Sequence, residues 1–255
     1  MEHIPYLKDL TFLYKSIEGR DTRLPHITRS QQFDQETLSH LFEFARFLRA
    51  HHHAHTHAHL LRHFLMLSLF WEASTRTRLS FESAAKRLGG DVIGTDNAAE
   101  FSSTIKGETL EDTVRVVSAY ADLVVMRHKE TGASDRAAAL DAIPIINGGD
   151  GTGQHPTQAL IDLFAIQEEC GQISDLHVAI VGDLLLGRTA RSLAYLLAKF
   201  KIATLYLVSH EVVRMGKDVI EYLRRHDVPF EETDDLRSVA DVADVIYMTR
   251  LQQER

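Results

Sequence analysis

The stretch Ser74-Thr75-Arg76-Thr77-Arg78 decides how the rest of this 255-residue chain is interpreted. It places three hydroxyls and two guanidiniums in one run, after a strand-like stretch at 64–70 and before a helix-like stretch at 79–88. A turn from a strand into a helix directs backbone N–H groups and the positive end of the helix dipole at one point. Hydroxyls and guanidiniums added there suit a phosphate-sized dianion. A helix cap with solvated arginines is the alternative, and the interleaved arginines favour the anion site.

The composition is that of an ordinary globular enzyme that is acidic overall. The chain is 44% hydrophobic and 25% charged, with a formal net charge of −8. This balance argues against a nucleic-acid partner, so an anionic ligand must be held by a local cluster of cations. The single cysteine, Cys170, excludes a disulfide within the chain and fits a reducing compartment. Without a signal-peptide or membrane-spanning pattern, we expect a cytoplasmic protein with no membrane partner.

Helix-like and strand-like stretches alternate along the chain. The apolar periodicity predicts helices at 36–49, 79–88, 109–120, 133–142, 156–169, 189–199, 212–225 and 236–240, and strands at 64–70, 92–93, 123–126, 143–146, 177–181, 204–208 and 245–248. Strands that alternate with helices form parallel sheets covered on both faces. The prediction is an α/β fold with two lobes, each a parallel sheet flanked by helices. We place the first domain at 1–154, a linking helix at 155–170 and the second domain at 171–255.

Polar clusters follow five of the predicted strands. They lie at 74–78, 127, 147–153, 182–188 and 249–252. In open α/β sheets, ligands bind beyond the carboxyl ends of the strands. The five clusters therefore predict one cleft between the two lobes.

The motif His155-Pro156-Thr157-Gln158 opens the predicted linking helix. Proline suits the first helical position, which leaves His155 at the helix entry. The positive end of the helix dipole disfavours an imidazolium there, so the ring is expected to be neutral. A neutral imidazole can donate a hydrogen bond to a carbonyl oxygen that gains negative charge. A capping or packing histidine is the alternative, and the glycine-rich run before it together with Gln158 favours the cleft.

Two further groups of residues add positive charge. The loop Lys106-Gly107-Glu108-Thr109-Leu110 follows Ser102 and carries a lysine that either swings over an anion as a lid or is simply solvated. Arg127, Arg188 and Arg250, with Gln252 beside the last, exceed what one phosphate requires, so a second substrate with carboxylates is predicted. The sequence around 182–188 lacks the G-x-G-x-x-G pattern, which argues against a nicotinamide cofactor.

A histidine-rich stretch at 51–63 holds seven of the fifteen histidines. Imidazole groups at this density bind transition metals, which makes a metal site one interpretation. The stretch lies between a predicted helix and a predicted strand, where loops tolerate biased composition. A surface loop is the interpretation that we favour.

Together these motifs resemble one known family. The run from Phe70 to Arg78, with Ser80-Phe81-Glu82, is similar to the carbamoyl-phosphate motif of the aspartate/ornithine carbamoyltransferase family. His155-Pro156-Thr157-Gln158 is similar to the family's second signature. The loop around Lys106 and the segment Met248-Thr249-Arg250-Leu251-Gln252 look like the aspartate branch rather than the ornithine branch.

The resemblance implies a role for each site residue. Carbamoyl phosphate would be bound through its phosphate, its carbonyl oxygen and its amino end by Ser74, Thr75, Arg76, Thr77, Arg127, His155 and Gln158. Aspartate would be held by Lys106, Arg188, Arg250 and Gln252. Catalysis would rest on Arg76, Thr77, Lys106, Arg127 and His155. Glu72 would tie the lobes together by pairing with Arg188 and Arg255 once both substrates are bound.

The resemblance also implies the reaction and the assembly. The amine of L-aspartate would attack carbamoyl phosphate to give N-carbamoyl-L-aspartate and phosphate, with no metal or organic cofactor. The family's working unit is a homotrimer in which Ser102 and Lys106 reach the site of a neighbouring subunit. A regulatory chain or a dihydroorotase are possible further partners. The alternatives are a non-catalytic scaffold of the same fold and a carbamoyltransferase for another amine such as ornithine.

Three features depart from the family pattern. Relatives continue beyond the position of Arg255, so we expect a second domain that is truncated and lacks a closing loop and terminal helices. Leu185-Leu186 stand where relatives often carry polar or aromatic residues. The histidine-rich stretch is also foreign to the pattern.

Overall fold

The first half of the chain folds around a parallel sheet. The computed structural model describes residues 25–51, 58–95, 98 and 107–250. The sheet has the strand order β2-β1-β3-β4, and every pair in it is parallel. Its elements are β1 (Leu65–Phe70), α3 (Thr75–Arg87), β2 (Asp91–Thr95), α5 (Leu110–Val117), β3 (Leu123–His128), α6 (Ala133–Ala138) and β4 (Ile145–Asp150).

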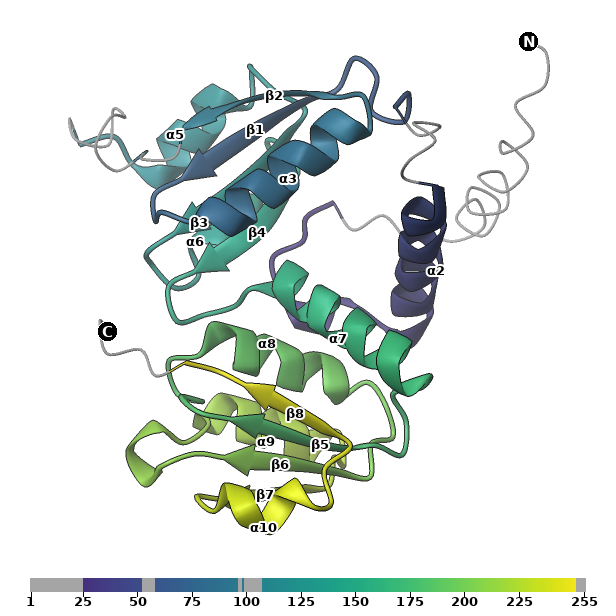
Figure 1. Ribbon diagram of the computed structural model, residues 1–255. Helices are drawn as coiled ribbons and strands as arrows, with labels where there is room; N and C mark the ends of the chain where they lie inside the picture. Colours follow the sequence, from purple (N-terminus) through teal and green to yellow (C-terminus); the bar gives the residue numbers. More distant parts are fainter. Residues whose placement is uncertain (1–24, 52–57, 96–97, 99–106, 251–255) are drawn as a thin grey trace.

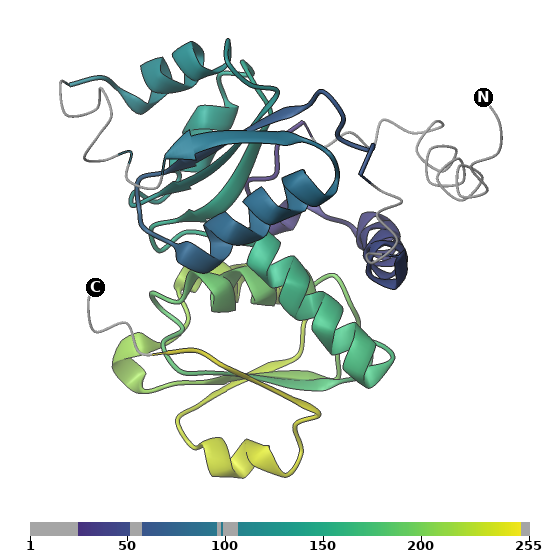
Figure 2. The ribbon, with the colours of Figure 1, turned by 45° about the horizontal axis from the view of Figure 1, so that its top comes forward.

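The second half repeats this architecture with a second four-stranded sheet. Its order is β7-β6-β5-β8, again with all pairs parallel. The long helix α7 (Pro156–Cys170) connects the two halves and runs between them in both views (Figures 1 and 2). The remaining elements are β5 (His177–Val181), α8 (Arg188–Leu197), β6 (Thr204–Val208), η4 (Glu211–Val213), α9 (Lys217–Arg225), β7 (Phe230–Thr233), α10 (Leu236–Ala240) and β8 (Val245–Met248). The predicted α/β class with two parallel sheets is confirmed.

Two predicted helices differ from the observed ones, and one observed strand is missing from the prediction, each for an identifiable reason. Helix α3 begins at Thr75, four residues before the predicted start at 79. The prediction missed this first turn because its polar residues show no apolar periodicity. Strand β7 has the sequence Phe-Glu-Glu-Thr and lies at the edge of its sheet, where both glutamates are exposed. It therefore lacks the apolar run by which the other strands were predicted. The helix predicted at 212–225 divides into η4 and α9, since Gly216 caps the second part in an extended conformation.

A segment near the N-terminus crosses from one lobe to the other. Ile27 makes a parallel bridge to Ile146 of β4, so this end adds to the edge of the first sheet. After η1 (Ser30–Gln32), the helix α2 (Gln35–His51) packs against α7. Phe33, Leu38 and Phe42 are buried in the same apolar core as α7, α8 and the second sheet. This core contains residues from both sides of position 154, so the predicted first domain contributes side chains to the core of the second lobe. The domain limits given above stay a prediction.

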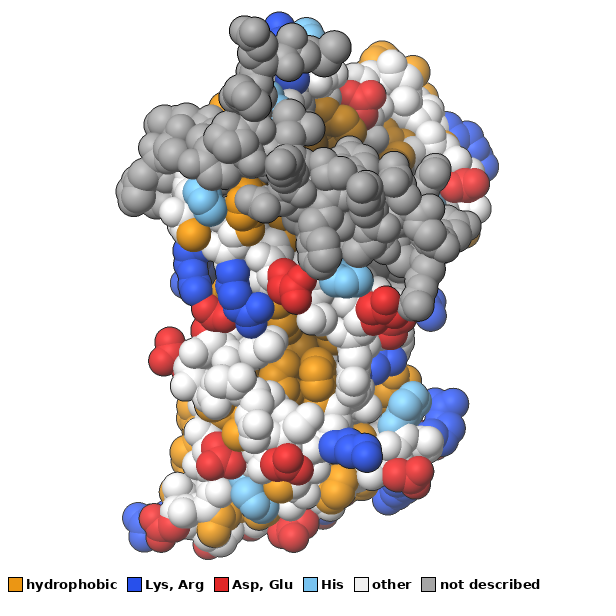
Figure 3. All heavy atoms as spheres, turned by 90° about the vertical axis from the view of Figure 1, so that its right-hand side faces the viewer, with side chains coloured by type: hydrophobic (Ala, Val, Ile, Leu, Met, Phe, Trp, Pro, Cys, Tyr) orange, Lys and Arg blue, Asp and Glu red, His pale blue; other side chains and the backbone are white. Residues whose placement is uncertain are grey.

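The surface mixes both signs of charge. Figure 3 shows one face, on which Lys and Arg side chains lie close to Asp and Glu side chains around an apolar area. On α2 and α7, Arg46 and Arg49 both pair with Glu168. Among the described residues, no helix is both long and apolar enough to cross a bilayer.

Candidate active site

The hydroxyl-rich run forms the first turn of α3 immediately after β1. Ser74 is the N-cap residue with an extended backbone, and its carbonyl accepts the N–H of Arg78 at 3.1 Å. Within the described part of the chain, the Ser74 side chain makes no capping hydrogen bond to its helix. The first N–H groups of α3 have no partner inside the helix and need another acceptor. This arrangement suits an anion at the start of α3, as the sequence predicts.

His155 is buried and lies beside Thr77 in the first turn of α3. It is the N-cap residue of α7, with Pro156 at the first helical position, and only 6% of it is exposed. Its backbone N–H donates to Ser192 Oγ on α8 at 2.9 Å. Its Nε2 atom lies 3.5 Å from Thr77 Oγ1, and its Nδ1 atom lies 3.4 Å from Thr157 Oγ1. The ring is therefore held between the start of α3 and the start of α7.

The charge of this histidine follows from its surroundings. Burial lowers the pKa of His155 to about 3, and the nearby cations of Arg188 and Arg127 act in the same direction. The carboxylate of Glu72 acts in the opposite direction and is outweighed. The imidazole is thus neutral throughout the physiological pH range. A neutral ring can donate one N–H to a developing oxyanion without carrying a charge into the buried site.

Two arginines from different lobes share one carboxylate. Arg127 on β3 approaches Glu72 Oε1 through Nη2 at 2.6 Å, and Arg188 at the start of α8 approaches the same oxygen through Nη2 at 3.0 Å. Both guanidiniums are nearly buried, with 11% and 10% of their side chains exposed. We call Glu72, Arg127, His155 and Arg188 the junction cluster, because it joins the carboxyl ends of the first sheet to the second lobe. Its formal charge is +1, which favours binding of a further anion.

The end of strand β4 and the residue that follows it supply the carbonyls that support both arginines. Arg127 Nη1 donates to the carbonyl of Gly148 at 3.2 Å, and Arg188 Nη1 donates to the carbonyl of Gly151 at 2.9 Å. Gly149 between them has φ +114°, and a Cβ atom there would lie 3.0 Å from Arg188 Cζ and 3.1 Å from Arg127 Nη1. Only a residue without a side chain lets both guanidiniums approach this closely.

Replacing Gly149 with alanine is therefore expected to lower the free energy of unfolding by about 2–4 kcal/mol, from backbone strain plus displacement of the two arginines. Gly171→Ala is the matched control, because Gly171 also has a positive φ, of +77°, and a Cβ atom there would meet nothing within 4 Å. Denaturant unfolding of both variants separates the two terms. Equal losses would show that contact with the arginines is not what requires glycine at position 149.

Of the other predicted site residues, the structure describes some and not others. Gln158 donates from Nε2 to Asp162 Oδ1 at 2.9 Å on α7. Arg250 is exposed and follows Thr249, whose hydroxyl donates to the carbonyl of Val181 at 3.1 Å. Four predicted site residues lie outside the described residues: Ser102, Lys106, Gln252 and Arg255. Residues 52–57 of the histidine-rich stretch at 51–63 lie outside them as well.

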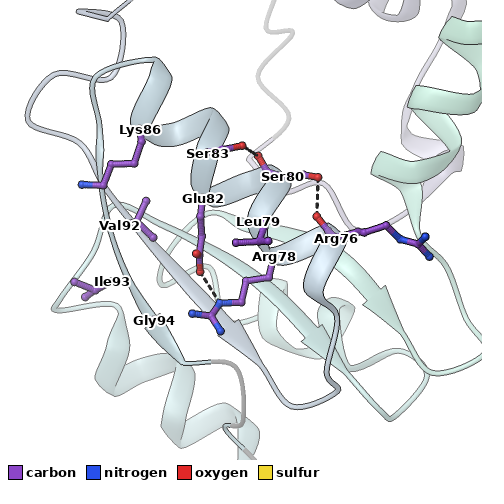
Figure 4. A pocket seen from close by; sticks show the side chains of 10 residues that line it. All are labelled: Arg76, Arg78, Leu79, Ser80, Glu82, Ser83, Lys86, Val92, Ile93 and Gly94. Carbon is purple, nitrogen blue, oxygen red and sulfur yellow. Dashed lines mark hydrogen bonds and ion pairs between the residues drawn. The ribbon is translucent and has the colours of Figure 1, made fainter.

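Arg76 and Arg78 diverge although they are two residues apart. Figure 4 shows the guanidinium of Arg76 pointing away from that of Arg78, which pairs with Glu82 Oε1 at 2.7 Å. Between α3 and β2 lies a groove of about 870 Å³, lined by Arg76, Arg78, Leu79, Ser80, Glu82, Ser83, Lys86, Val92, Ile93 and Gly94. The groove does not include the junction cluster, so it is a separate surface feature.

Sequence reasoning missed two contributors to this site. Ser192 holds the backbone N–H of His155 and is fully buried on α8. It lies four residues after Arg188, and this helical spacing on a shared face is the signal that could have found it. Asp162, one turn after Gln158, follows from the same spacing on α7.

The structure defines a protein with two α/β lobes and a cluster of cationic side chains at their junction. Residues 25–168 match the model of the aspartate/ornithine carbamoyltransferase carbamoyl-phosphate-binding domain, and residues 174–255 match the model of the Asp/Orn-binding domain. The chain therefore belongs to the aspartate/ornithine carbamoyltransferase family.

Relatives in the aspartate branch are similar over most of this chain. Aspartate carbamoyltransferase 1 of Pisum sativum is 54% identical over 237 residues, which cover 93% of this chain and 61% of the relative. The catalytic subunit of aspartate carbamoyltransferase from Methanocella arvoryzae is 47% identical, with 90% and 74% covered. The chain thus spans about three-fifths of the length of the plant relatives.

Solved structures show the same fold. Aspartate transcarbamoylase from Trypanosoma cruzi in complex with carbamoyl phosphate and aspartate has a TM-score of 0.86 and 39% identity, covering 90% of this chain and 73% of that chain. The same enzyme in complex with N-(phosphonacetyl)-L-aspartic acid has a TM-score of 0.85, again with 39% identity, covering 90% of this chain and 73% of that one.

The expected location is wrong. The sequence led us to expect a cytoplasmic protein, but relatives from Pisum sativum, Arabidopsis thaliana and Oryza sativa are named as chloroplastic. The expectation rested on the absence of a secretory signal and of a membrane-spanning pattern, neither of which tests for the amphipathic, Arg- and Ser-rich transit peptide of chloroplast proteins.

Proposed function

We propose that this chain transfers the carbamoyl group of carbamoyl phosphate to the α-amine of L-aspartate, giving N-carbamoyl-L-aspartate and phosphate. The observation that carries the proposal is the junction cluster, in which two nearly buried arginines from different lobes lie beside a neutral histidine. The relatives named above, and the Trypanosoma cruzi enzyme bound to both substrates, support this choice of substrates.

The roles that we propose for the residues are those that the family resemblance implies. The first turn of α3, from Ser74 to Thr77, binds the phosphate group through its hydroxyls, its N–H groups and Arg76. Arg127, His155 and Thr77 contact the carbonyl oxygen of the carbamoyl group, and Gln158 contacts its amino end. In the second lobe, Arg188 and Arg250 hold the carboxylates of aspartate together with Gln252, and Lys106 completes this set. These assignments, like the domain limits at 154 and 171, are part of the proposal.

The chemistry is acyl transfer between two anions. The neutral α-amine of aspartate forms a bond to the carbamoyl carbon, and the carbonyl oxygen becomes an oxyanion. The bond from carbon to the phosphate oxygen then breaks, and phosphate leaves with the amine proton. Fixed cations offset the repulsion between the substrates, and donors aimed at the oxyanion stabilise the transition state. Removal of one such donor costs on the order of 3 kcal/mol in activation free energy.

Product formation tests the proposal. The protein is incubated with carbamoyl phosphate labelled at carbon and with either L-aspartate or L-ornithine, and the products are separated chromatographically. Labelled N-carbamoyl-L-aspartate is expected with aspartate. Labelled citrulline in preference to it would favour an ornithine-type enzyme, and neither product from a folded protein would favour a non-catalytic scaffold.

The proposed assembly is a homotrimer with shared active sites, to which Ser102 and Lys106 of a neighbouring subunit contribute. The groove beside α3 supports it, because Leu79 and Ile93 are 56% and 42% exposed there beside the cations of Arg78 and Lys86 (Figure 4). Exposed apolar side chains of this size are typical of protein interfaces. Association with a regulatory chain or a dihydroorotase stays a prediction of the resemblance.

Leu79→Asp is expected to shift the protein from trimer toward monomer, weakening association at least about tenfold, because a buried carboxylate replaces an apolar contact. Light scattering coupled to size-exclusion chromatography measures the mass. Ile161→Asp is the control, since Ile161 on α7 is 59% exposed but lies outside the groove. The trimer interface is elsewhere if Leu79→Asp leaves the mass unchanged.

A further inference from the structure

A chain of hydrogen bonds runs from Gln158 on α7 to the last strand of the second sheet. Gln158 Nε2 donates to Asp162 Oδ1 at 2.9 Å, and Tyr247 Oη on β8 donates to Asp162 Oδ2 at 2.9 Å. Tyr247 also makes a hydrogen bond with the side chain of Thr189, the second residue of α8. Asp162 therefore joins a residue of the proposed carbamoyl-phosphate site to two elements of the second lobe.

The protonation states fix the direction of these bonds. Burial, and next the negative charge of Asp162, raise the pKa of Tyr247, so its hydroxyl keeps its proton and donates it. Burial raises the pKa of Asp162, while the hydrogen bonds from Gln158 and Tyr247 act in the opposite direction. A carboxylate with a donor at each oxygen acts as an acceptor on both sides. Both oxygens of Asp162 are therefore engaged as acceptors.

This geometry orients the amide of Gln158. An amide presents an NH₂ group on one side and a carbonyl oxygen on the other. One N–H of Gln158 donates to Asp162, which holds the NH₂ branch of the amide against α7 and leaves the branch that carries Oε1 able to accept from a ligand. A ligand on that side is then recognised by the N–H donor that it offers to Oε1.

We infer that Asp162 is a positioning residue that sets donor specificity, by holding Gln158 with its amide oxygen toward the acyl phosphate. The inference rests on the proposed function, since it assigns the selection of carbamoyl phosphate within that site. Acetyl phosphate carries a methyl group in place of the amino group and gives Gln158 Oε1 no partner. A site built to accept a hydrogen bond rejects such an analogue, because its own polar group is left unpaired.

The substitution Asp162→Asn tests the inference directly. The asparagine side chain has one acceptor and one NH₂ group, so Gln158 can turn over and present its NH₂ group to the ligand. Isothermal titration calorimetry with carbamoyl phosphate, acetyl phosphate and inorganic phosphate gives three dissociation constants for each protein. The unmodified protein is expected to bind carbamoyl phosphate about tenfold more tightly than acetyl phosphate, the effect of one hydrogen bond. In Asp162→Asn, this ratio is expected to fall toward one, while the affinity for inorganic phosphate is unchanged.

Tyr247→Phe is the matched control. It removes the other hydrogen bond to Asp162 and leaves the carboxylate that orients Gln158, so the ratio is expected to persist. Loss of the ratio in both variants would show that packing between the lobes, and not the orientation of Gln158, sets specificity. A ratio retained in Asp162→Asn would also overturn the inference.

Failure of the proposed function gives a different result. If the unmodified protein forms no N-carbamoyl-L-aspartate yet binds carbamoyl phosphate selectively, and Asp162→Asn loses this selectivity, the function falls and the role of Asp162 stands. If it forms the product but binds both acyl phosphates equally, the role of Asp162 falls and the function stands. If it binds none of the three compounds, both fall.

Discussion

Replacing Glu72 with alanine is expected to lower the free energy of unfolding by about 3–5 kcal/mol, the usual effect of removing one partner from a buried ion pair. The loss is large because one oxygen of Glu72 lies 2.6 Å from Arg127 and 3.0 Å from Arg188. Without it, two nearly buried cations remain side by side. Denaturant unfolding monitored by circular dichroism measures the change.

An added anion should recover part of this loss. Inorganic phosphate bound near Arg127 and Arg188 supplies the negative charge that the alanine variant lacks, so stability should rise with phosphate concentration more steeply than in the unmodified protein. Glu130→Ala is the control, because Glu130 and its partner Arg136 have side chains that are 54% and 45% exposed, so this pair should contribute less than about 1 kcal/mol. Similar losses in the two variants would contradict the claim that Glu72 stabilises the fold by neutralising two nearly buried arginines.

His155 is expected to make the fold less stable in acid. Its pKa is about 3 in the folded protein and ordinarily about 6.5 in an unfolded chain. As pH falls below 6.5, the unfolded chain takes up a proton that the folded protein refuses, so stability decreases. Between pH 7.5 and pH 4.5 this one group should remove about 2–3 kcal/mol from the free energy of unfolding.

The variant His155→Gln isolates this contribution. Glutamine does not titrate, so the difference in stability between the two proteins should change by the same amount over that range. Other histidines such as His128, whose pKa burial also lowers, affect both proteins equally. A stability difference that stays constant from pH 7.5 to pH 4.5 would show that folding does not lower the pKa of His155.

Much of the fold could be predicted from the sequence because its signals are local. Strands β1, β3 and β5 are short apolar runs whose length favours a strand, and α7 is a long segment that Pro156 opens. Strand β7 could not be predicted in this way, since an edge strand with two exposed glutamates resembles a loop. The packing of α2 into the core of the second lobe depends on contacts between distant residues, which periodicity does not report.

The candidate site was predictable in its residue types and less so in its partners. The rule that ligands bind at the carboxyl ends of strands predicts that Arg127 and Arg188 lie in one cleft, and the glycine-rich run before the linking helix favours the same cleft for His155. The sequence did not indicate that Arg127 shares the carboxylate of Glu72 with Arg188, because that depends on the angle between two lobes. Ser192 and Asp162 lie four residues after Arg188 and Gln158, a spacing that the sequence contains, but the hydrogen bond from His155 to Ser192 depends on how α7 and α8 pack.

Binding of N-(phosphonacetyl)-L-aspartate tests the central claim most directly, because this compound joins a phosphate-like group to an aspartate in one molecule. Calorimetry should show binding at one site per chain, at least about tenfold weaker in Arg127→Met, in which Glu72 keeps Arg188 as a partner. Arg136→Met, which removes an exposed arginine paired with Glu111 and Glu130, should bind as tightly as the unmodified protein. An unmodified protein that is folded but does not bind, or equal affinity in Arg127→Met, would contradict the account.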